Sequence, residues 1–257
     1  MPYVNLPGVD LWYEDTGGDG IPVILLHAAT GTTDCWIHQI TAFTAAGFRC
    51  IAYDRRTWGR SRPTDAAAQP GYQGDDLNGL IERLGLDRCH LVATAAGGIT
   101  GIDYALSHPE RVRSLAVANT IGGVQEEEYL DVQHRMRPPE IQNLPEHLRE
   151  LGPSYRGADP EGTARWVEIE HASRPYGRLP AQPVREPITY ARLATMRVPT
   201  LVLSGQADIL APPLLMRMLA AHIPNSRFAT LEDVGHAGFW ERPEVWNGIV
   251  LEFIGGH

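Results

Sequence analysis

The sequence predicts an α/β fold in which a mostly parallel, eight-stranded sheet is flanked by helices on both faces. Two observations lead to this prediction. Short apolar runs alternate along the chain with longer runs of helical pattern, and the short runs are apolar at nearly every position. Strands of that kind are typical of parallel sheets that are buried on both faces. A chain of 257 residues, 43% of them hydrophobic and 21% charged, is long enough for one large domain with a sizeable core.

The expected elements follow in order along the chain. Residues 3–6 and 10–14 flank Pro7-Gly8, which is a turn signal, and we expect them to form an opening hairpin. Six further strands are expected at residues 22–26, 48–53, 89–93, 112–118, 200–204 and 227–231. Helices are expected between these strands at residues 36–46, 75–84, 96–108, 213–222 and 243–254.

The alternation of strands and helices stops between about residues 122 and 190. This segment is rich in Pro, Arg and Glu and has helical patterns at 126–136 and 159–172. Asp159-Pro160-Glu161 is a good helix start, because it offers a capping carboxylate, a proline in the first turn and a further acid. We therefore expect a core made of residues 1–121 and 191–257. Residues 122–190 are expected to form a helical cap, inserted into the same domain, over the carboxyl edge of the sheet.

Composition and charge exclude several classes of partner. The net charge of −9 argues against nucleic acid and against an anionic membrane surface. The first five residues show no signal peptide, and the longest apolar runs are far too short to span a bilayer. Cys35, Cys50 and Cys89 are odd in number and lack CxxC spacing, which favours reduced thiols in the cytoplasm. We expect a small-molecule substrate, no metal and no cofactor. The oligomeric state stays open, with a homodimer as one option.

The segment after the strand at 89–93 carries the most informative signal. Small residues at Ala93, Gly97 and Gly98 are typical of a strand that turns sharply into a helix. In such a turn the corner residue has strained backbone geometry and is expected to be a nucleophile such as Ser, Cys or Asp. The corner residue of this chain is Ala95, which has no nucleophilic atom.

Two further polar residues follow strands near the end of the chain. Asp208 comes after the strand at 200–204, and His236 comes after the strand at 227–231. The carboxyl ends of parallel strands meet at one edge of a sheet, where open α/β sheets bind their ligands. The chain order of Ala95, Asp208 and His236 is that of a nucleophile–acid–histidine triad. In this triad His236 is the expected general base, and Asp208 fixes its tautomer.

The loop after the strand at 22–26 reads His27-Ala28-Ala29-Thr30-Gly31. A loop at this point can supply one main-chain N–H to an oxyanion hole, and the residue after the corner supplies the second. The expected donors are the N–H groups of Ala29 and Ala96. Both are main-chain groups, so an alanine at the corner leaves them intact.

These motifs together resemble the α/β-hydrolase superfamily over essentially the whole chain. The resemblance includes Tyr53-Asp54-Arg55-Arg56-Thr57-Trp58-Gly59-Arg60-Ser61, the run from Val198 to Asp208, and Gly235-His236. Arg111-Val112-Arg113-Ser114-Leu115-Ala116-Val117-Ala118-Asn119-Thr120 and the compact cap are most similar to the 3-oxoadipate enol-lactonase and meta-cleavage C–C hydrolase branch. Ala95 departs from the family pattern, as does Ala28, where the family usually has Gly.

Other side chains near the predicted edge are candidates for binding the substrate. His27, Trp36, Trp58 and Phe239 are expected to line the pocket, although buried aromatic residues are often only core and His27 is a candidate anchor of its loop. Cys35 lies near a helix start, but this fold does not place it over the corner. The predicted cap contains arginines that alternate with acids, which is typical of a solvated face. One or two of them could bind a substrate carboxylate. These arginines are Arg135, Arg137, Arg156, Arg174, Arg178 and Arg185.

Three interpretations of the function stay open, in this order of preference. The first is a hydrolase of a small ester, enol-lactone or C–C bond in which a serine at position 95 has been replaced by alanine. The second is a naturally serine-less enzyme whose His236–Asp208 pair acts as a general base, such as a cofactor-independent oxygenase, a lyase or a hydrolase with direct water attack. The third is a ligand-binding homologue without catalysis. An intact acid–histidine pair argues against the third, because a binding protein has no need of an oriented base.

Overall fold

The structure is a computed structural model that describes residues 2–64, 71–177 and 182–257. Its sheet runs in the order β1 (Tyr3–Leu6), β2 (Val9–Asp15), β4 (Arg49–Tyr53), β3 (Pro22–Leu26), β6 (Cys89–Thr94), β7 (Val112–Ala118), β8 (Thr200–Gly205) and β9 (Arg227–Leu231). A short strand β5 (Arg62–Pro63) pairs with β2. The six strands from β4 to β9 along this order are parallel, whereas β2 is antiparallel to β1, β4 and β5. The predicted mostly parallel α/β sheet is confirmed.

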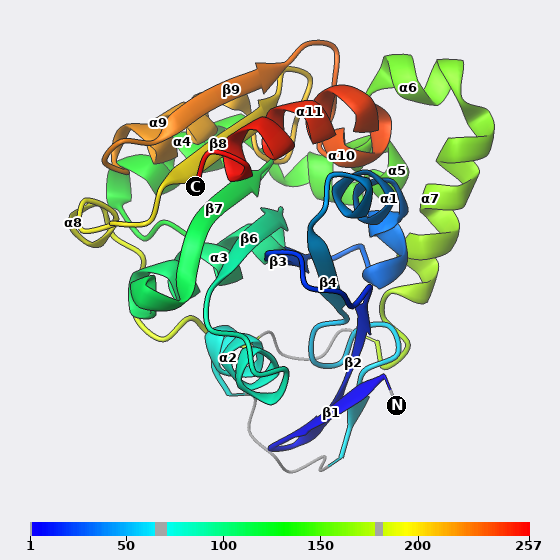
Figure 1. Ribbon diagram of the computed structural model, residues 1–257. Helices are drawn as coiled ribbons and strands as arrows, with labels where there is room; N and C mark the ends of the chain where they lie inside the picture. Colours follow the sequence, from blue (N-terminus) through cyan, green and yellow to red (C-terminus); the bar gives the residue numbers. More distant parts are fainter. Residues whose placement is uncertain (1, 65–70, 178–181) are drawn as a thin grey trace.

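Helices cover both faces of this sheet (Figure 1). Alternate residues of each strand face opposite sides, so that Ile24 and Leu26 of β3 join one core and Val23 and Leu25 the other. The first core is closed by α2 (Gln73–Arg83), α3 (Ala96–Ser107) and α9 (Pro213–Ala221). The second is closed by α1 (Ile37–Ala45), α10 (Gly238–Glu241) and α11 (Pro243–Ile254). In the ranges that the structure describes, no helix is long and apolar enough to cross a membrane.

One predicted helix is shorter than expected at its start. The sequence pattern predicts a single helix at 36–46, but a 3-10 turn at Thr33–Trp36 precedes α1. The side chain of Thr32 accepts a hydrogen bond from the N–H of Asp34 at 3.2 Å, and this cap starts the turn before the apolar pattern begins. The other predicted strands and core helices lie within two residues of their observed bounds.

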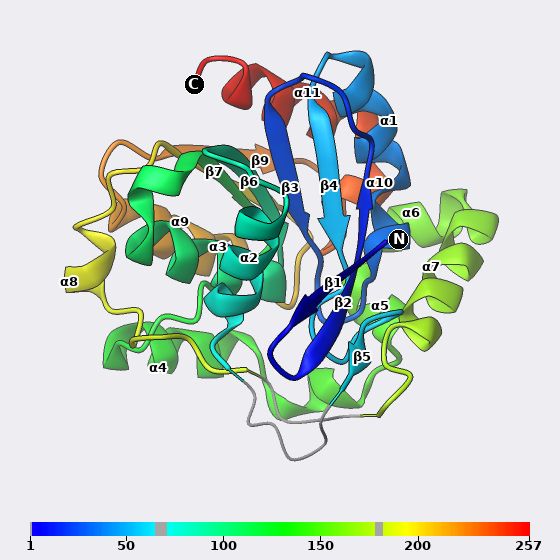
Figure 2. The ribbon, with the colours of Figure 1, turned by 60° about the horizontal axis from the view of Figure 1, so that its bottom comes forward.

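The segment between β7 and β8 is helical. It contains α4 (Glu127–Met136), α5 (Glu146–Glu150), α6 (Pro153–Ala158) and α7 (Pro160–Ala172), followed by α8 (Tyr190–Leu193). Asp159 caps α7 by accepting a hydrogen bond from the N–H of Gly162 at 2.8 Å, as its position before a proline predicts. In Figure 2 the arrowheads of β3 and β4 point toward the side of the molecule where α4 and α5 lie. This segment therefore lies at the carboxyl edge of the sheet.

Candidate active site

Ala95 forms a strained corner between β6 and α3. Its φ of 47° and ψ of −116° are values that residues with a side chain rarely adopt. The N–H of Ala95 donates to the carbonyl oxygen of Ala118 in β7 at 3.0 Å, which ties the corner to the neighbouring strand. A Cβ atom on Gly97 would lie 2.1 Å from the carbonyl oxygen of Leu26, so only glycine fits there. The expected strand–turn–helix geometry is present.

Asp208 and His236 lie in direct contact across the carboxyl edge. The His236 Nδ1 atom is 2.8 Å from Oδ2 and 3.0 Å from Oδ1 of Asp208, and both residues are buried. Oδ1 of Asp208 also accepts hydrogen bonds from the N–H groups of Leu210 at 2.8 Å and Ala211 at 2.9 Å. With Nδ1 engaged by the carboxylate, Nε2 is the nitrogen that His236 presents on its cavity side.

The charges of this pair reinforce one another. Burial alone would raise the pKa of Asp208, but the charge and hydrogen bond of His236 outweigh it, and the pKa lies below its ordinary value. Burial alone would lower the pKa of His236, but Asp208, and after it Glu150, raise it above its ordinary value. The pair therefore favours a histidine that accepts a proton readily.

Asn119 supports the acid and was not among the predicted site residues. Its Nδ2 atom donates to Oδ2 of Asp208 at 2.8 Å and to the carbonyl oxygen of Gly235 at 3.2 Å. It is the first residue after β7 and has a positive φ of 49°, which asparagine tolerates better than most residues. A polar residue directly after a buried strand was the signal that could have identified it.

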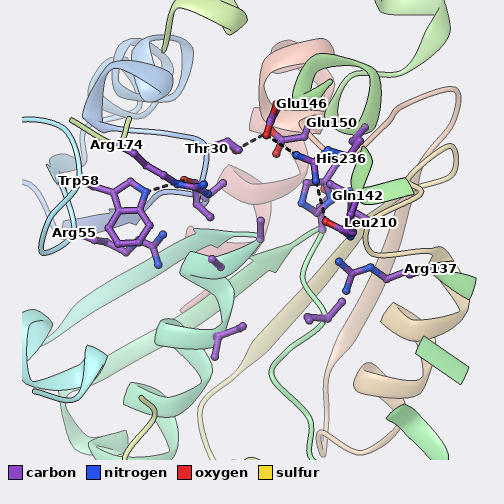
Figure 3. Close-up of a pocket in the computed structure, with 18 of the residues that line it drawn as sticks. Thr30, Arg55, Trp58, Arg137, Gln142, Glu146, Glu150, Arg174, Leu210 and His236 are labelled. Carbon is purple, nitrogen blue, oxygen red and sulfur yellow. Dashed lines mark hydrogen bonds and ion pairs between the residues drawn. The ribbon is translucent and has the colours of Figure 1, made fainter. Parts of the chain in front are cut away.

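A cavity of about 490 Å³ opens beside His236 and the corner (Figure 3). The predicted oxyanion donors Ala29 and Ala96 both line it. The N–H of Ala96 is at the start of α3, where helix N–H groups lack partners within the helix. The full lining is Ala28, Ala29, Thr30, Arg55, Thr57, Trp58, Ala95, Ala96, Ile99, Asn119, Ile121, Arg137, Gln142, Glu146, Arg149, Glu150, Arg174, Gly177, Leu210 and His236.

Of the four predicted substrate-binding residues, the structure places one on the cavity wall. Trp58 lines the cavity, and its Nε1 atom donates to the carbonyl oxygen of Ala29 at 2.7 Å, which holds the loop at residues 27–31, the predicted oxyanion loop. Trp36 and Phe239 pack against each other in the core with ring centroids 4.8 Å apart, and neither is on the cavity wall. The prediction for these two residues was wrong, because their helices turn them toward the sheet rather than toward its edge.

His27 anchors its loop instead of facing the cavity. Its Nδ1 atom donates to the carbonyl oxygen of Ala28 at 2.6 Å, and Nε2 accepts the N–H of Arg55 at 2.9 Å, so both ring nitrogens are engaged. Burial, and then the charge of Arg55, lower the pKa of His27 to about 3. The ring is therefore neutral at ordinary pH, and it is not on the cavity wall, contrary to the expectation that it lines the pocket.

Cys35 offers no replacement for the missing nucleophile. Its side chain is fully buried, and burial together with the nearby Asp54 raises its pKa well above the ordinary value. A thiol of that kind does not ionise at neutral pH.

Arginine side chains give the cavity a positive wall. Arg55 is stacked over Trp58, 4.3 Å from the ring centroid, and Arg174 approaches the same ring at 5.9 Å. Burial lowers the pKa of Arg55 to about 10, which leaves it charged at neutral pH. Within the described part of the chain, Nε and Nη2 of Arg55 and Nε of Arg137 are buried atoms without a hydrogen-bond partner. Figure 3 shows Arg55 and Arg137 on different sides of the cavity.

Two of the predicted cap arginines thus line the cavity, namely Arg137 and Arg174. The others are engaged elsewhere: Arg135 pairs with Asp131, Arg156 donates to the carbonyl oxygen of Leu151, and Arg185 pairs with Asp75. Arg178 lies outside the described residues. Arg55 was not among the predicted substrate-binding residues. Its place soon after the strand at 48–53, at the carboxyl edge, was the available signal.

Comparison with known proteins places this geometry in a family. A 2-hydroxy-6-oxononadienedioate/2-hydroxy-6-oxononatrienedioate hydrolase from Burkholderia vietnamiensis is 30% identical, over 98% of this chain and 94% of that protein. A thermophilic esterase from Thermogutta terrifontis, solved with malate bound, is 26% identical with a TM-score of 0.81, covering 100% of this chain and 97% of that one. The enol-lactonase from Burkholderia xenovorans LB400 shares the fold, with a TM-score of 0.78, 23% identity and coverage of 99% and 100%. Residues 23–248 match the alpha/beta hydrolase family, and the chain belongs to that family.

Proposed function

We propose that this chain hydrolyses an ester, enol-lactone or C–C bond in a small, carboxylate-bearing substrate, with His236 as the general base. The observation that carries the proposal is the buried His236–Asp208 hydrogen bond of 2.8 Å at a cavity that Ala29, Ala95 and Ala96 also line. An oriented base beside two main-chain N–H groups is the arrangement that acyl-transfer chemistry requires. The helical segment at 122–190 acts as the cap of this cavity.

Because Ala95 lacks a nucleophilic atom, water takes the place of the serine hydroxyl. The oxygen of a water molecule attacks the substrate carbonyl carbon while Nε2 of His236 accepts its proton. The carbonyl oxygen becomes negative and is stabilised by the N–H groups of Ala29 and Ala96. The bond to the leaving group then breaks, and the imidazolium returns the proton to the leaving oxygen of an ester or lactone. In C–C cleavage the leaving carbon receives that proton.

The positive wall supports a substrate with a carboxylate. Arg55, Arg137 and Arg174 line the cavity, and a carboxylate is the group that pairs best with a guanidinium. The name of the Burkholderia vietnamiensis relative describes a substrate with two carboxylates, which agrees with this chemistry.

The test compares the parent chain with Ala95→Ser and His236→Ala. Two chromogenic esters of equal length serve as probes, the mono-4-nitrophenyl ester of glutaric acid and 4-nitrophenyl pentanoate, together with an enol-lactone. We expect turnover of the glutarate ester by the parent, a loss of at least about 100-fold in His236→Ala, and a burst of nitrophenol in Ala95→Ser as an acyl-enzyme forms. We expect Arg55→Met to raise KM for the glutarate ester but not for the pentanoate ester.

The outcomes separate the open interpretations. An inactive parent with an active Ala95→Ser variant supports a serine hydrolase whose nucleophile has been replaced, and refutes water attack in the parent. Oxygen uptake with an enolisable phenol, in the absence of ester turnover, supports base-only oxygenase chemistry. If neither the parent nor Ala95→Ser turns over any probe, while a carboxylate ligand still binds, the proposal is wrong and the chain is a binding protein.

A further inference from the structure

Glu150 is a buried carboxyl group that the reaction above does not use. It ends α5, its residue is 5% exposed, and it lines the same cavity as His236 and Ala95. Figure 3 shows its side chain beside His236, at the end of the cavity away from Trp58. A glutamate is rarely buried unless it is paired, and a buried carboxyl group in a cleft is a candidate functional group.

The position of Glu150 is fixed by contacts at both ends of the residue. Its carbonyl oxygen accepts the N–H groups of His236 at 2.7 Å and Ala237 at 3.0 Å, which ties α5 to the histidine loop. Its Oε2 atom accepts the hydroxyl of Thr30 at 2.8 Å, which ties the carboxyl to the oxyanion loop. Within the described residues, Oε1 has no hydrogen-bond partner. Glu150 therefore bridges the base and the oxyanion loop and keeps one oxygen for a ligand.

Charged groups from several elements surround this carboxyl. The pKa of Glu150 lies above its ordinary value, because burial raises it and Glu170 of α7 adds to the increase. His236, the Thr30 hydroxyl and Arg149 act in the opposite direction. His236 in turn faces Asp208 and Glu150, which raise its pKa, and Arg137, which lowers it. Glu150 and His236 are thus coupled electrostatically, and each favours the charged form of the other.

We propose that Glu150 is the water-positioning residue of this site and holds, through a hydrogen bond to Oε1, the water molecule that His236 deprotonates. The inference rests on the proposed function and assigns the water-binding group within it. In this arrangement one hydrogen of the water is donated to Nε2 of His236 and the other to Oε1 of Glu150. A lone pair of the water oxygen is then directed at the substrate carbonyl carbon, and the carbonyl oxygen accepts hydrogen bonds from the N–H groups of Ala29 and Ala96. Only the first hydrogen is transferred, so Glu150 stays a carboxylate and the charges balance.

The experiment uses Glu150→Gln in the parent and in the Ala95→Ser chain. Glutamine keeps the size of the side chain and can still accept the Thr30 hydroxyl. In Ala95→Ser the acylation step uses the serine oxygen and needs no water, whereas deacylation does. We expect Glu150→Gln to leave the rate of the nitrophenol burst within about threefold and to slow deacylation, and parent turnover, by about 100-fold or more.

The pH profile gives a second readout. Because the Glu150 carboxylate raises the pKa of His236, its removal should shift the acidic limb of kcat/KM toward lower pH. Glu168→Gln removes an exposed acid of α7 that pairs with Arg165, and it should leave both rates and the acidic limb unchanged.

Each other outcome overturns the role. Equal slowing of burst and deacylation shows that Glu150 acts through His236 and not on the water. Unchanged deacylation, or an acidic limb that does not move, shows a purely structural carboxyl. Absence of turnover in both backgrounds overturns the proposed function along with this role, whereas turnover that survives Glu150→Gln overturns this role alone.

Discussion

The buried, neutral His27 should make the folded state sensitive to acid. Its pKa is about 3 in the folded protein against an ordinary value of 6.5, so between about pH 6.5 and pH 3 the unfolded chain binds up to one proton more than the native chain. Stability from this group is complete above pH 6.5 and is lost progressively as pH falls toward 3. The loss amounts to about 2 kcal/mol between pH 7 and pH 5, and to about 5 kcal/mol once the folded value is reached.

His27→Gln isolates this contribution. A glutamine never ionises, and its Oε1 can accept the N–H of Arg55 in place of Nε2. The substitution should cost about 1 kcal/mol at pH 7, because the hydrogen bond from Nδ1 to Ala28 is lost. The variant should nevertheless lose about 2 kcal/mol less than the parent between pH 7 and pH 5, since all other titrating groups are shared.

The assay is urea unfolding at pH 7 and pH 5, with the free energy of unfolding extrapolated to water for both proteins. His171→Gln is the matched control, because this ring of α7 is three-quarters exposed, and the variant should follow the parent. If the parent and His27→Gln lose the same free energy within about 0.5 kcal/mol, His27 is not held neutral and the argument from its two hydrogen bonds fails.

Two further predictions concern the site. Asp208→Asn, made in whichever of the parent and Ala95→Ser is faster, should lower kcat by about 10⁴-fold with little change in KM. The reason is that an amide no longer fixes the His236 tautomer or stabilises the imidazolium. A loss of less than tenfold would contradict this. Gly97→Ala should destabilise the fold by about 3 kcal/mol in urea unfolding, since its Cβ would lie 2.1 Å from the carbonyl oxygen of Leu26. Gly248→Ala in α11, where a Cβ meets open space, should instead stabilise by up to about 1 kcal/mol.

The sheet and the contact between Asp208 and His236 could be predicted because strong local signals determine both. Strands β3, β6 and β8 are buried at nearly every position, and their carboxyl ends share one edge. A residue directly after such a strand has little freedom in where it lies. Asn119 directly follows β7, and Arg55 and Asp208 lie two and three residues after β4 and β8, so all three lie near this edge.

Residues on helices could not be placed from the sequence with the same certainty. Trp36 and Trp58 are both tryptophans near the carboxyl edge, yet Trp36 lies next to a helix whose packing turns it into the core, and Trp58 lies in a loop. Glu150 ends a five-residue helix in a segment without strands, so its position depends on contacts with the His236 loop 86 residues later. No pattern within such a short helix shows which side chain will face the cavity.

The strained turns at the ends of β6 and β7 bear on the proposed reaction of a chain without a serine. Ala95 and Asn119 both have positive φ, and such a conformation costs roughly 1–2 kcal/mol for each residue. At Asn119 the turn directs the side-chain amide to Asp208. At Ala95 the turn directs no functional side-chain atom. It sets the start of α3, which places Ala96 at the cavity wall. In the proposed mechanism the corner would therefore serve the oxyanion as much as a nucleophile, and this part of the site would need no hydroxyl at position 95.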